Sequence, residues 1–133
     1  MNPLADALRD LDAAKARVER DAGAAADAMR SDLIAQLLPV LDNLDRTIAA
    51  AGETGALVEG VALVRTQLEG VLRGYGLERF DAVAAPFDPA IHDAISIVRA
   101  PGSHNRVVDQ LAAGFRFGGK LLRPAKVVVG RAF

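Results

Sequence analysis

The feature that most constrains the fold is a stripe of apolar residues along the first 50 residues. Between Leu4 and Met29 the apolar positions follow steps of four and three, with one gap, which is the heptad pattern of two helices packed together. Two successive steps of four, from Met29 to Leu33 and then Leu37, break this register, and the stripe widens to a face suited to a helix bundle. Residues 3–50 are therefore predicted to form one helix, roughly 70 Å long at about 1.5 Å per residue.

A chain of 133 residues cannot bury so long a stripe against itself. A second copy of the chain is the simplest cover, so we expect a homodimer; a single solvated helix is the less favoured alternative. Pro39 lies inside the predicted helix, where a proline removes a backbone hydrogen bond and costs about 3 kcal/mol. Whether the helix is kinked near Leu38 therefore stays open.

A second helix is predicted after the polar, glycine-containing segment 52–55. Its apolar residues again follow steps of four and three, from Leu57 to Tyr75. Gly76 can adopt the left-handed conformation that ends a helix. Two such helical hairpins, one from each subunit, would form a four-helix bundle.

From Leu77 onward, short apolar runs separated by proline and glycine indicate strands. Strands are predicted over three ranges: 94–98, 107–111 and 121–129. Ile95 and Ile97 alternate with Ser96, as in a half-buried strand. The predicted fold class is α+β. A coiled-coil and bundle region for dimerisation spans 1–76, and a small, mostly β domain spans 77–133.

Composition narrows the possible functions. The chain has no cysteine, which excludes a disulfide framework and a thiolate metal site. It lacks both a secretory-signal pattern and a run of 18 apolar residues, so we expect a cytoplasmic protein without a membrane partner. The segment from Arg99 to Phe133 carries seven basic residues and one acidic residue. Such a charge excess favours an acidic partner, either nucleic acid or an acidic protein surface.

The spacing of Gly114, Gly119 and Lys120 matches the first part of a phosphate-binding loop. That motif requires Ser or Thr after the lysine and a helix that begins there. Here a leucine follows the lysine, and the valine run beyond it predicts a strand. We therefore interpret Gly118-Gly119 as a turn that joins a strand at 115–117 to the last predicted strand.

His92 and His104 are the only histidines, and their separation is weak evidence for a metal site. A structural interpretation accounts better for the segment FDPAIH. Asp88 is expected to cap a short helical turn with Pro89 at its first position, while Phe87 packs inward. No catalytic constellation is recognised, so we expect a protein that is not an enzyme and needs neither metal nor cofactor.

Four segments of the chain resemble GrpE, the family of nucleotide exchange factors for DnaK-type chaperones. The segments are 37–48, 56–80, 87–95 and 112–130, and FDPAIHDAI and LRPAKVVV are the most specific parts. The resemblance implies a parallel homodimer with a paired long helix, a four-helix bundle and one small β domain per subunit. It implies a co-chaperone in protein folding and the heat-shock response, which opens the chaperone's nucleotide-binding domain to release ADP. Unfolded polypeptide would be contacted only indirectly, and nucleic acid not at all.

The resemblance also carries residue roles. The implied chaperone contacts are Lys15, Arg17, Gly76, Leu111, Lys120, Arg123 and Val129. The implied structural signature is Phe87, Asp88, Pro89, His92 and Pro124. The chain departs from the family where Ala13 replaces an asparagine and Phe115 replaces a tyrosine. The sequence also begins without the family's acidic extension before the long helix, and whether that extension is naturally absent or removed stays open. Two alternatives remain: a GrpE-like adaptor dimer without exchange activity, and a basic nucleic-acid-binding module.

Overall fold

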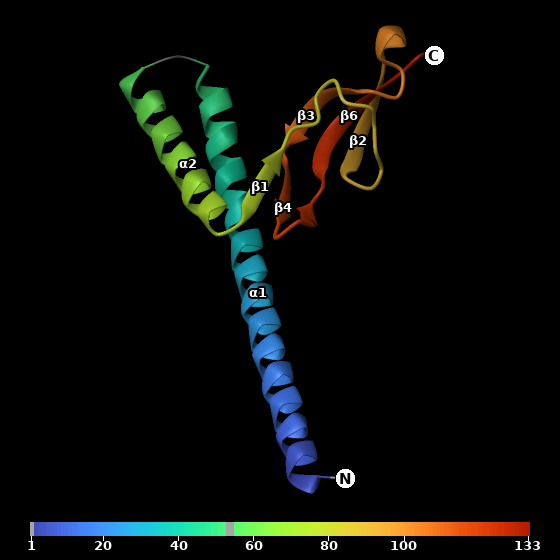
Figure 1. Cartoon of the computed structure of the whole chain (residues 1–133). Helices are drawn as coiled ribbons and strands as arrows, with labels where there is room; N and C mark the ends of the chain where they lie inside the picture. The colour runs from blue at the N-terminus through green and yellow to red at the C-terminus, as the bar shows by residue number, and fades with distance from the viewer. Residues whose placement is uncertain (1, 53–54) are drawn as a thin grey trace. The chain divides into compact units, whose positions relative to one another are not determined.

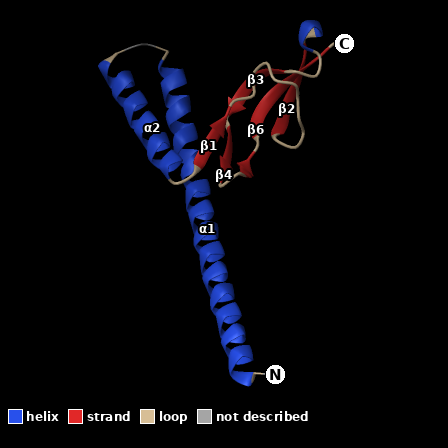
Figure 2. Cartoon of the chain, viewed as in Figure 1, coloured by secondary structure: helices blue, strands red, loops and turns tan. Residues whose placement is uncertain are grey.

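A computed structural model describes residues 2–52 and 55–133 as two helices followed by two small β-sheets (Figures 1 and 2). The predicted α+β class is confirmed, while the four-helix bundle of two subunits remains a prediction. The chain divides into two compact units, residues 1–34 and 35–133. The functional division between residues 76 and 77 also remains a prediction.

Helix α1 spans Pro3–Ala51 and continues through Pro39. Its first turn is capped by Asn2, whose side-chain oxygen accepts hydrogen bonds from the backbone N–H groups of Leu4 and Ala5 at 3.1 and 3.2 Å. In the first unit the apolar stripe lies on the helix surface. Leu4 is 70% exposed and Met29 is 73% exposed, so a single chain leaves this stripe uncovered.

Helix α2 spans Ala56–Gly74. Gly76 follows it with φ +109°, and its N–H donates to the carbonyl oxygen of Arg73 at 3.0 Å. The prediction that Gly76 adopts a positive φ where this helix ends is therefore confirmed. One side of α2 carries the buried Leu72. Of the predicted heptad positions, Val61 and Leu68 are half-buried, and the exposed ones are Leu57, Val64, Val71 and Tyr75.

In the described ranges 2–52 and 55–133, six strands form two three-stranded sheets. The first sheet has the order β1-β4-β5 and is antiparallel, with β1 at Leu77–Phe80, β4 at Gly114–Phe117 and β5 at Lys120–Arg123. The second sheet has the order β2-β6-β3, with β2 at His92–Arg99, β6 at Ala125–Arg131 and β3 at Val107–Ala112. Strand β6 pairs in parallel with β2 and antiparallel with β3. A short 3-10 helix, η1, spans Pro101–Ser103.

The core of the β region lies around the central strand β6. Its five most buried members are at most 1% exposed: Ala82, Val107, Ala125, Val127 and Val129. Phe80 and Phe87 are partly buried and pack against this cluster. The inward packing predicted for Phe87 is thus confirmed.

The strand predicted at 121–129 is in fact two strands separated at Pro124. Proline has no N–H to donate to a ladder, so it fits the connection between strands better than a strand interior. The break assigns the two halves to different sheets. Strand β5 continues the hairpin from β4, while β6 becomes the centre of the second sheet.

The half-buried character predicted for the segment 94–98 is wrong. Ile95 is 50% exposed and Ile97 is 54% exposed. They lie on β2, an outer strand of its sheet, where the pairing register shifts between Ala94 and Ser96. Alternation in sequence therefore identified a strand here but did not identify a buried face.

Candidate functional site

The hairpin β4–β5 is the element that first suggested a phosphate-binding loop. Its turn is formed by Gly118 and Gly119, with φ +57° and +79°, as the sequence predicted. Lys120 follows as the first residue of a strand, and its side chain is exposed. A phosphate loop needs a helix N-terminus at this place. The hairpin therefore presents an exposed cation on a tight turn, and its geometry is not that of a nucleotide site.

Arg123, at the end of β5, is anchored in several directions. Its Nη1 and Nη2 donate to the Asp42 carboxylate of α1 at 2.5 and 2.8 Å, and its Nε donates to the Ala113 carbonyl oxygen at 3.1 Å. The guanidinium also lies 5.1 Å from the ring centroid of the buried Phe115. Arg123 thus connects the first sheet to α1.

The FDPAIH segment is held by local hydrogen bonds. The Asp88 side chain accepts from the N–H of Ala90 at 3.0 Å, which confirms the predicted cap. The N–H of Asp88 donates in turn to Nδ1 of His92 at 2.9 Å, and His92 is only 5% exposed. Within the described residues no group of three or more His, Cys, Asp or Glu side chains is arranged to hold a metal ion.

The other residues implied as chaperone contacts differ in exposure. Lys15 and Arg17 are exposed on α1 in the first unit, and Leu111 on β3 is 60% exposed. Val129, by contrast, is 1% exposed and belongs to the core around β6. Lys120 and Leu111 are therefore the implied β-strand residues with the most accessible side chains.

A group of ion pairs at the helix-to-sheet junction was not recognised from the sequence. Arg65 donates to Asp45 of α1 at 2.7 Å and to Glu69 at 2.8 Å, and the Glu69 side chain is only 9% exposed. Arg79 of β1 lies 3.7 Å from the same carboxylate. Burial works to lower the pKa of Arg65, but its hydrogen bond and charge interactions with Asp45 and Glu69 outweigh burial and raise it. The i,i+4 spacing of Arg65 and Glu69 within an apolar helix was the available signal.

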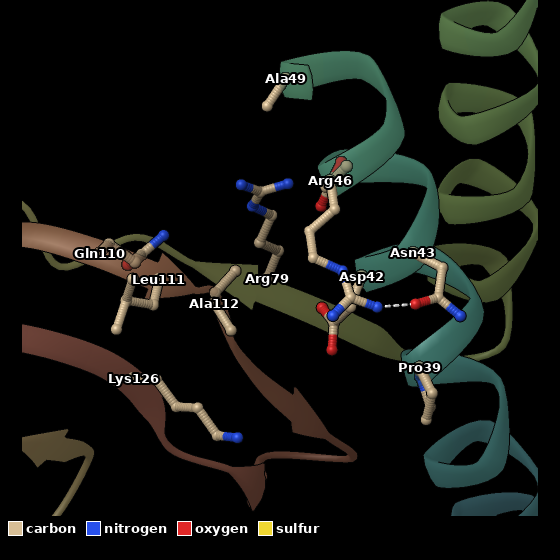
Figure 3. A pocket seen from close by; sticks show the side chains of 12 residues that line it. Pro39, Asp42, Asn43, Arg46, Ala49, Arg79, Gln110, Leu111, Ala112 and Lys126 are labelled. Atoms are coloured by element: carbon tan, nitrogen blue, oxygen red, sulfur yellow. Dashed lines mark hydrogen bonds between the residues drawn. The ribbon is translucent and has the colours of Figure 1, made fainter. Parts of the chain in front are cut away.

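A cleft of about 610 Å³ lies within the second unit (Figure 3). One wall is the α1 face that carries Pro39, Asp42 and Arg46, and the opposite wall is formed by β3 and by Lys126 of β6. Arg79 of β1 also lines it. The cleft is therefore bounded by helix and by strands from both sheets, and charged groups from all of them face it.

The sequence matches known proteins along most of its length. The sequence pattern of the GrpE family matches residues 2–131. Protein GrpE of Saccharophagus degradans is 36% identical over 124 residues, which cover 90% of this chain and 64% of the relative. Protein GrpE of Stenotrophomonas maltophilia strain K279a is 42% identical over 130 residues, covering 94% and 76%. Protein GrpE 2 of Streptomyces avermitilis is 39% identical over 124 residues, covering 92% and 61%.

The chain thus spans between about three fifths and three quarters of the length of these relatives. Within the described residues, no helix has both the length and the apolar character needed to cross a membrane. The match extends over the long helix, the second helix and all six strands. This chain belongs to the GrpE family.

Proposed function

We propose that this chain is a co-chaperone that binds the nucleotide-binding domain of a DnaK-type chaperone and opens it to release ADP. The observation that carries the proposal is the family match over residues 2–131. Such a factor catalyses no bond change. It shifts its partner's population because it binds the open, nucleotide-poor state more tightly than the closed state. Reciprocity then requires ADP or ATP to weaken the complex by the same factor.

The active form in this proposal is a homodimer. The exposed stripe of the first unit, with Leu8 at 54% and Leu11 at 64% exposed, supports it. So do the exposed heptad positions of α2, of which Leu57 is 83% exposed. A second copy would cover both surfaces with the same heptad geometry.

The implied contact residues divide by exposure into two roles. Lys15, Arg17, Leu111 and Lys120 have accessible side chains, and we assign direct contacts to them. The remaining three act by placing the β strands: Gly76 ends α2 with a positive φ, Arg123 connects β5 to α1, and Val129 fills the core. A rigidly placed β region suits a protein that must hold its partner's domain open. A mobile β region would lose binding free energy when it becomes ordered in the complex.

The test is stopped-flow release of a fluorescent ADP analogue from the cognate DnaK-type chaperone. We expect strong acceleration that saturates at two subunits of this protein per chaperone. Absence of acceleration from a folded dimer would leave the GrpE-like adaptor as the better description.

The role of Lys120 can be tested separately. Lys120→Glu reverses an exposed charge on a turn, so the fold is expected to survive while exchange slows by roughly tenfold. Arg99→Glu makes the same change on the exposed face of β2 and is the matched control. Equal exchange rates for the two variants would exclude a contact role for Lys120.

The nucleic-acid-binding alternative has less support from the described residues. Arg123 is already paired with Asp42, and Phe115 is 2% exposed, so neither is available as a phosphate or stacking contact. A gel shift that weakens steeply with salt, from a protein that leaves ADP release unchanged, would favour this alternative.

A further inference from the structure

We propose that the cleft between α1 and strands β3 and β6 binds an extended, acidic segment of the partner chaperone, and that Arg46 and Lys126 hold its carboxylates. This inference rests on the proposed function, because it adds a contact to the same complex. The cleft has a volume of about 610 Å³ and combines charged, apolar and strand-edge features.

The acidic side chains of the cleft are already neutralised. Asp42 accepts two hydrogen bonds from Arg123 at 2.5 and 2.8 Å, and Asp45 accepts one from Arg65 at 2.7 Å. Arg79 lies 3.1 Å from Asp81 and is therefore also paired. These three lining residues contribute little net charge to a ligand in the cleft.

Two cationic side chains that line the cleft, Arg46 and Lys126, are not paired with a carboxylate in the described part of the chain. Arg46 donates to the side-chain oxygen of Asn43, a neutral amide on the same helix (Figure 3). In the part of the chain that the structure describes, neither Arg46 nor Lys126 has a carboxylate oxygen within 4.0 Å. One cation comes from the helix wall and the other from the sheet wall. The cleft is therefore suited to a ligand that places negative charges between them.

The sheet wall favours an extended ligand. Strand β3 is an outer strand in the order β2-β6-β3. Its edge at Val107 already exchanges hydrogen bonds with the backbone of Ala84 and Ala85, so an added strand could pair only along the rest of β3, residues 109–112. Leu111 of β3 lines the cleft and is 60% exposed, so it offers an apolar contact beside the charges. Pro39 lines the opposite wall and is also exposed. A segment with acidic and apolar side chains in alternation would match this lining.

A protein segment fits better than a nucleic acid. Among the described residues that line the cleft none is aromatic, so bases have no platform on which to stack. A polypeptide can place a few carboxylates at the two cations. A nucleic acid would bring a phosphate with every nucleotide, and the described lining has no further cation without a carboxylate partner.

The test measures binding of the nucleotide-free chaperone nucleotide-binding domain to the dimer of this 133-residue chain by calorimetry at several salt concentrations. The double variant Arg46→Glu with Lys126→Glu is expected to weaken binding by roughly a hundredfold at low salt, about tenfold for each reversed charge. The difference should shrink as salt rises. Arg99→Glu, outside the cleft, is the control and is expected to remain within about twofold of the wild-type protein.

The outcomes separate this inference from the proposed function. A wild-type dimer that does not bind the chaperone would overturn both. If the wild-type protein binds and the double variant binds as well as Arg99→Glu, the cleft inference alone is wrong. Lys126→Gln covers the case in which the double variant misfolds, because Lys126 is exposed on β6; it should weaken binding severalfold. The same two proteins are tested with single-stranded DNA. If the wild-type protein binds the DNA, and the double variant loses that binding but still binds the chaperone, the inference is also contradicted.

Discussion

The sheet β2-β6-β3 and the helix of the first unit differ in how far their apolar side chains are exposed. Val127 and Val129 on the central strand are 0% and 1% exposed, and the surrounding chain covers them completely. Leu4 and Leu11 on the helix are 70% and 64% exposed, although full burial of a leucine stabilises a protein by about 1.5–3 kcal/mol. The sheet thus has its core within one chain, whereas the helix has an apolar stripe whose core requires another chain.

Helix α2 has both buried and exposed apolar side chains. Leu72 is 5% exposed and packs within its own chain, while Leu57, at 83%, and Val64, at 57%, remain open. The difference indicates that folding of the β region should not depend on protein concentration, whereas order in the helices should depend on it.

The largest effect is expected in the sheet. Val127→Asp places an unpaired carboxylate at a fully buried position of the central strand and should destabilise the β region by about 4 kcal/mol or more. NMR spectra should lose the dispersed amide signals of residues 77–131. Sedimentation should still show a dimer, because the helical stripe is unchanged. A dissociated variant would mean that the two regions fold as one unit.

The next effect concerns the helical stripe. Leu11→Gln keeps helix propensity but removes one apolar side chain from each copy, so it should weaken dimerisation by about 3 kcal/mol, or roughly a hundredfold. Sedimentation equilibrium measures the dissociation constant, and the β-region amide signals should be unchanged. Asp12→Gln, at the neighbouring exposed position, is the control. Equal dissociation constants for the two variants would show that the stripe is not the dimer interface.

The sequence revealed the elements whose signals are local. Helical periodicity, the glycine that follows α2 and the Gly118-Gly119 turn each depend on residues a few positions apart. Sheet order depends on distant partners, such as the parallel pairing of His92 with Ala125, and no local pattern contains that information. The exposure of Ile95 was missed for the same reason, because alternation alone does not say whether anything covers a face.

The site could be predicted only as separate residues. Arg123 and Lys120 were identified through the family resemblance, but the partner of Arg123 is Asp42, 81 positions away. The cleft likewise brings α1 beside β3 and β6, so neither its volume nor the set of residues that line it follows from sequence spacing. Pro124 contained an available signal, since proline disfavours a strand interior and marks the break between β5 and β6.

A moderate effect is expected where the first sheet meets α1. The Arg123–Asp42 pair is bidentate and partly buried, with side-chain exposures of 21% and 30%. A double-mutant cycle with Arg123→Gln and Asp42→Asn should give a coupling energy of about 1–2 kcal/mol in urea unfolding. The exposed Arg9–Asp6 pair, at 75% and 50%, is the matched comparison and should give about 0.3 kcal/mol. Similar coupling energies would show that Arg123 does not fix the sheet to the helix.

The smallest effect is a pH dependence in the loop after β1. A hydrogen bond from the Gln110 side chain at 2.8 Å, together with Arg79 at 3.1 Å, lowers the pKa of Asp81 below its ordinary value of 3.8. Because the folded-state pKa is depressed, the ionised Asp81 stabilises the fold at pH values above 3.8, and this contribution is lost as the pH falls through the lower folded-state value.

Asp81→Asn should therefore lower the melting temperature of the β region by roughly 2 °C near neutral pH, since the pair is largely exposed. The difference from wild type should shrink as the pH falls below 3.8 and vanish below the lowered folded-state pKa of Asp81. Asp93→Asn removes another exposed charge of the same region and controls for the change in net charge. A difference that persists in acid would mean that Asp81 acts through the shape of its hydrogen bond to Gln110, with no role for its charge.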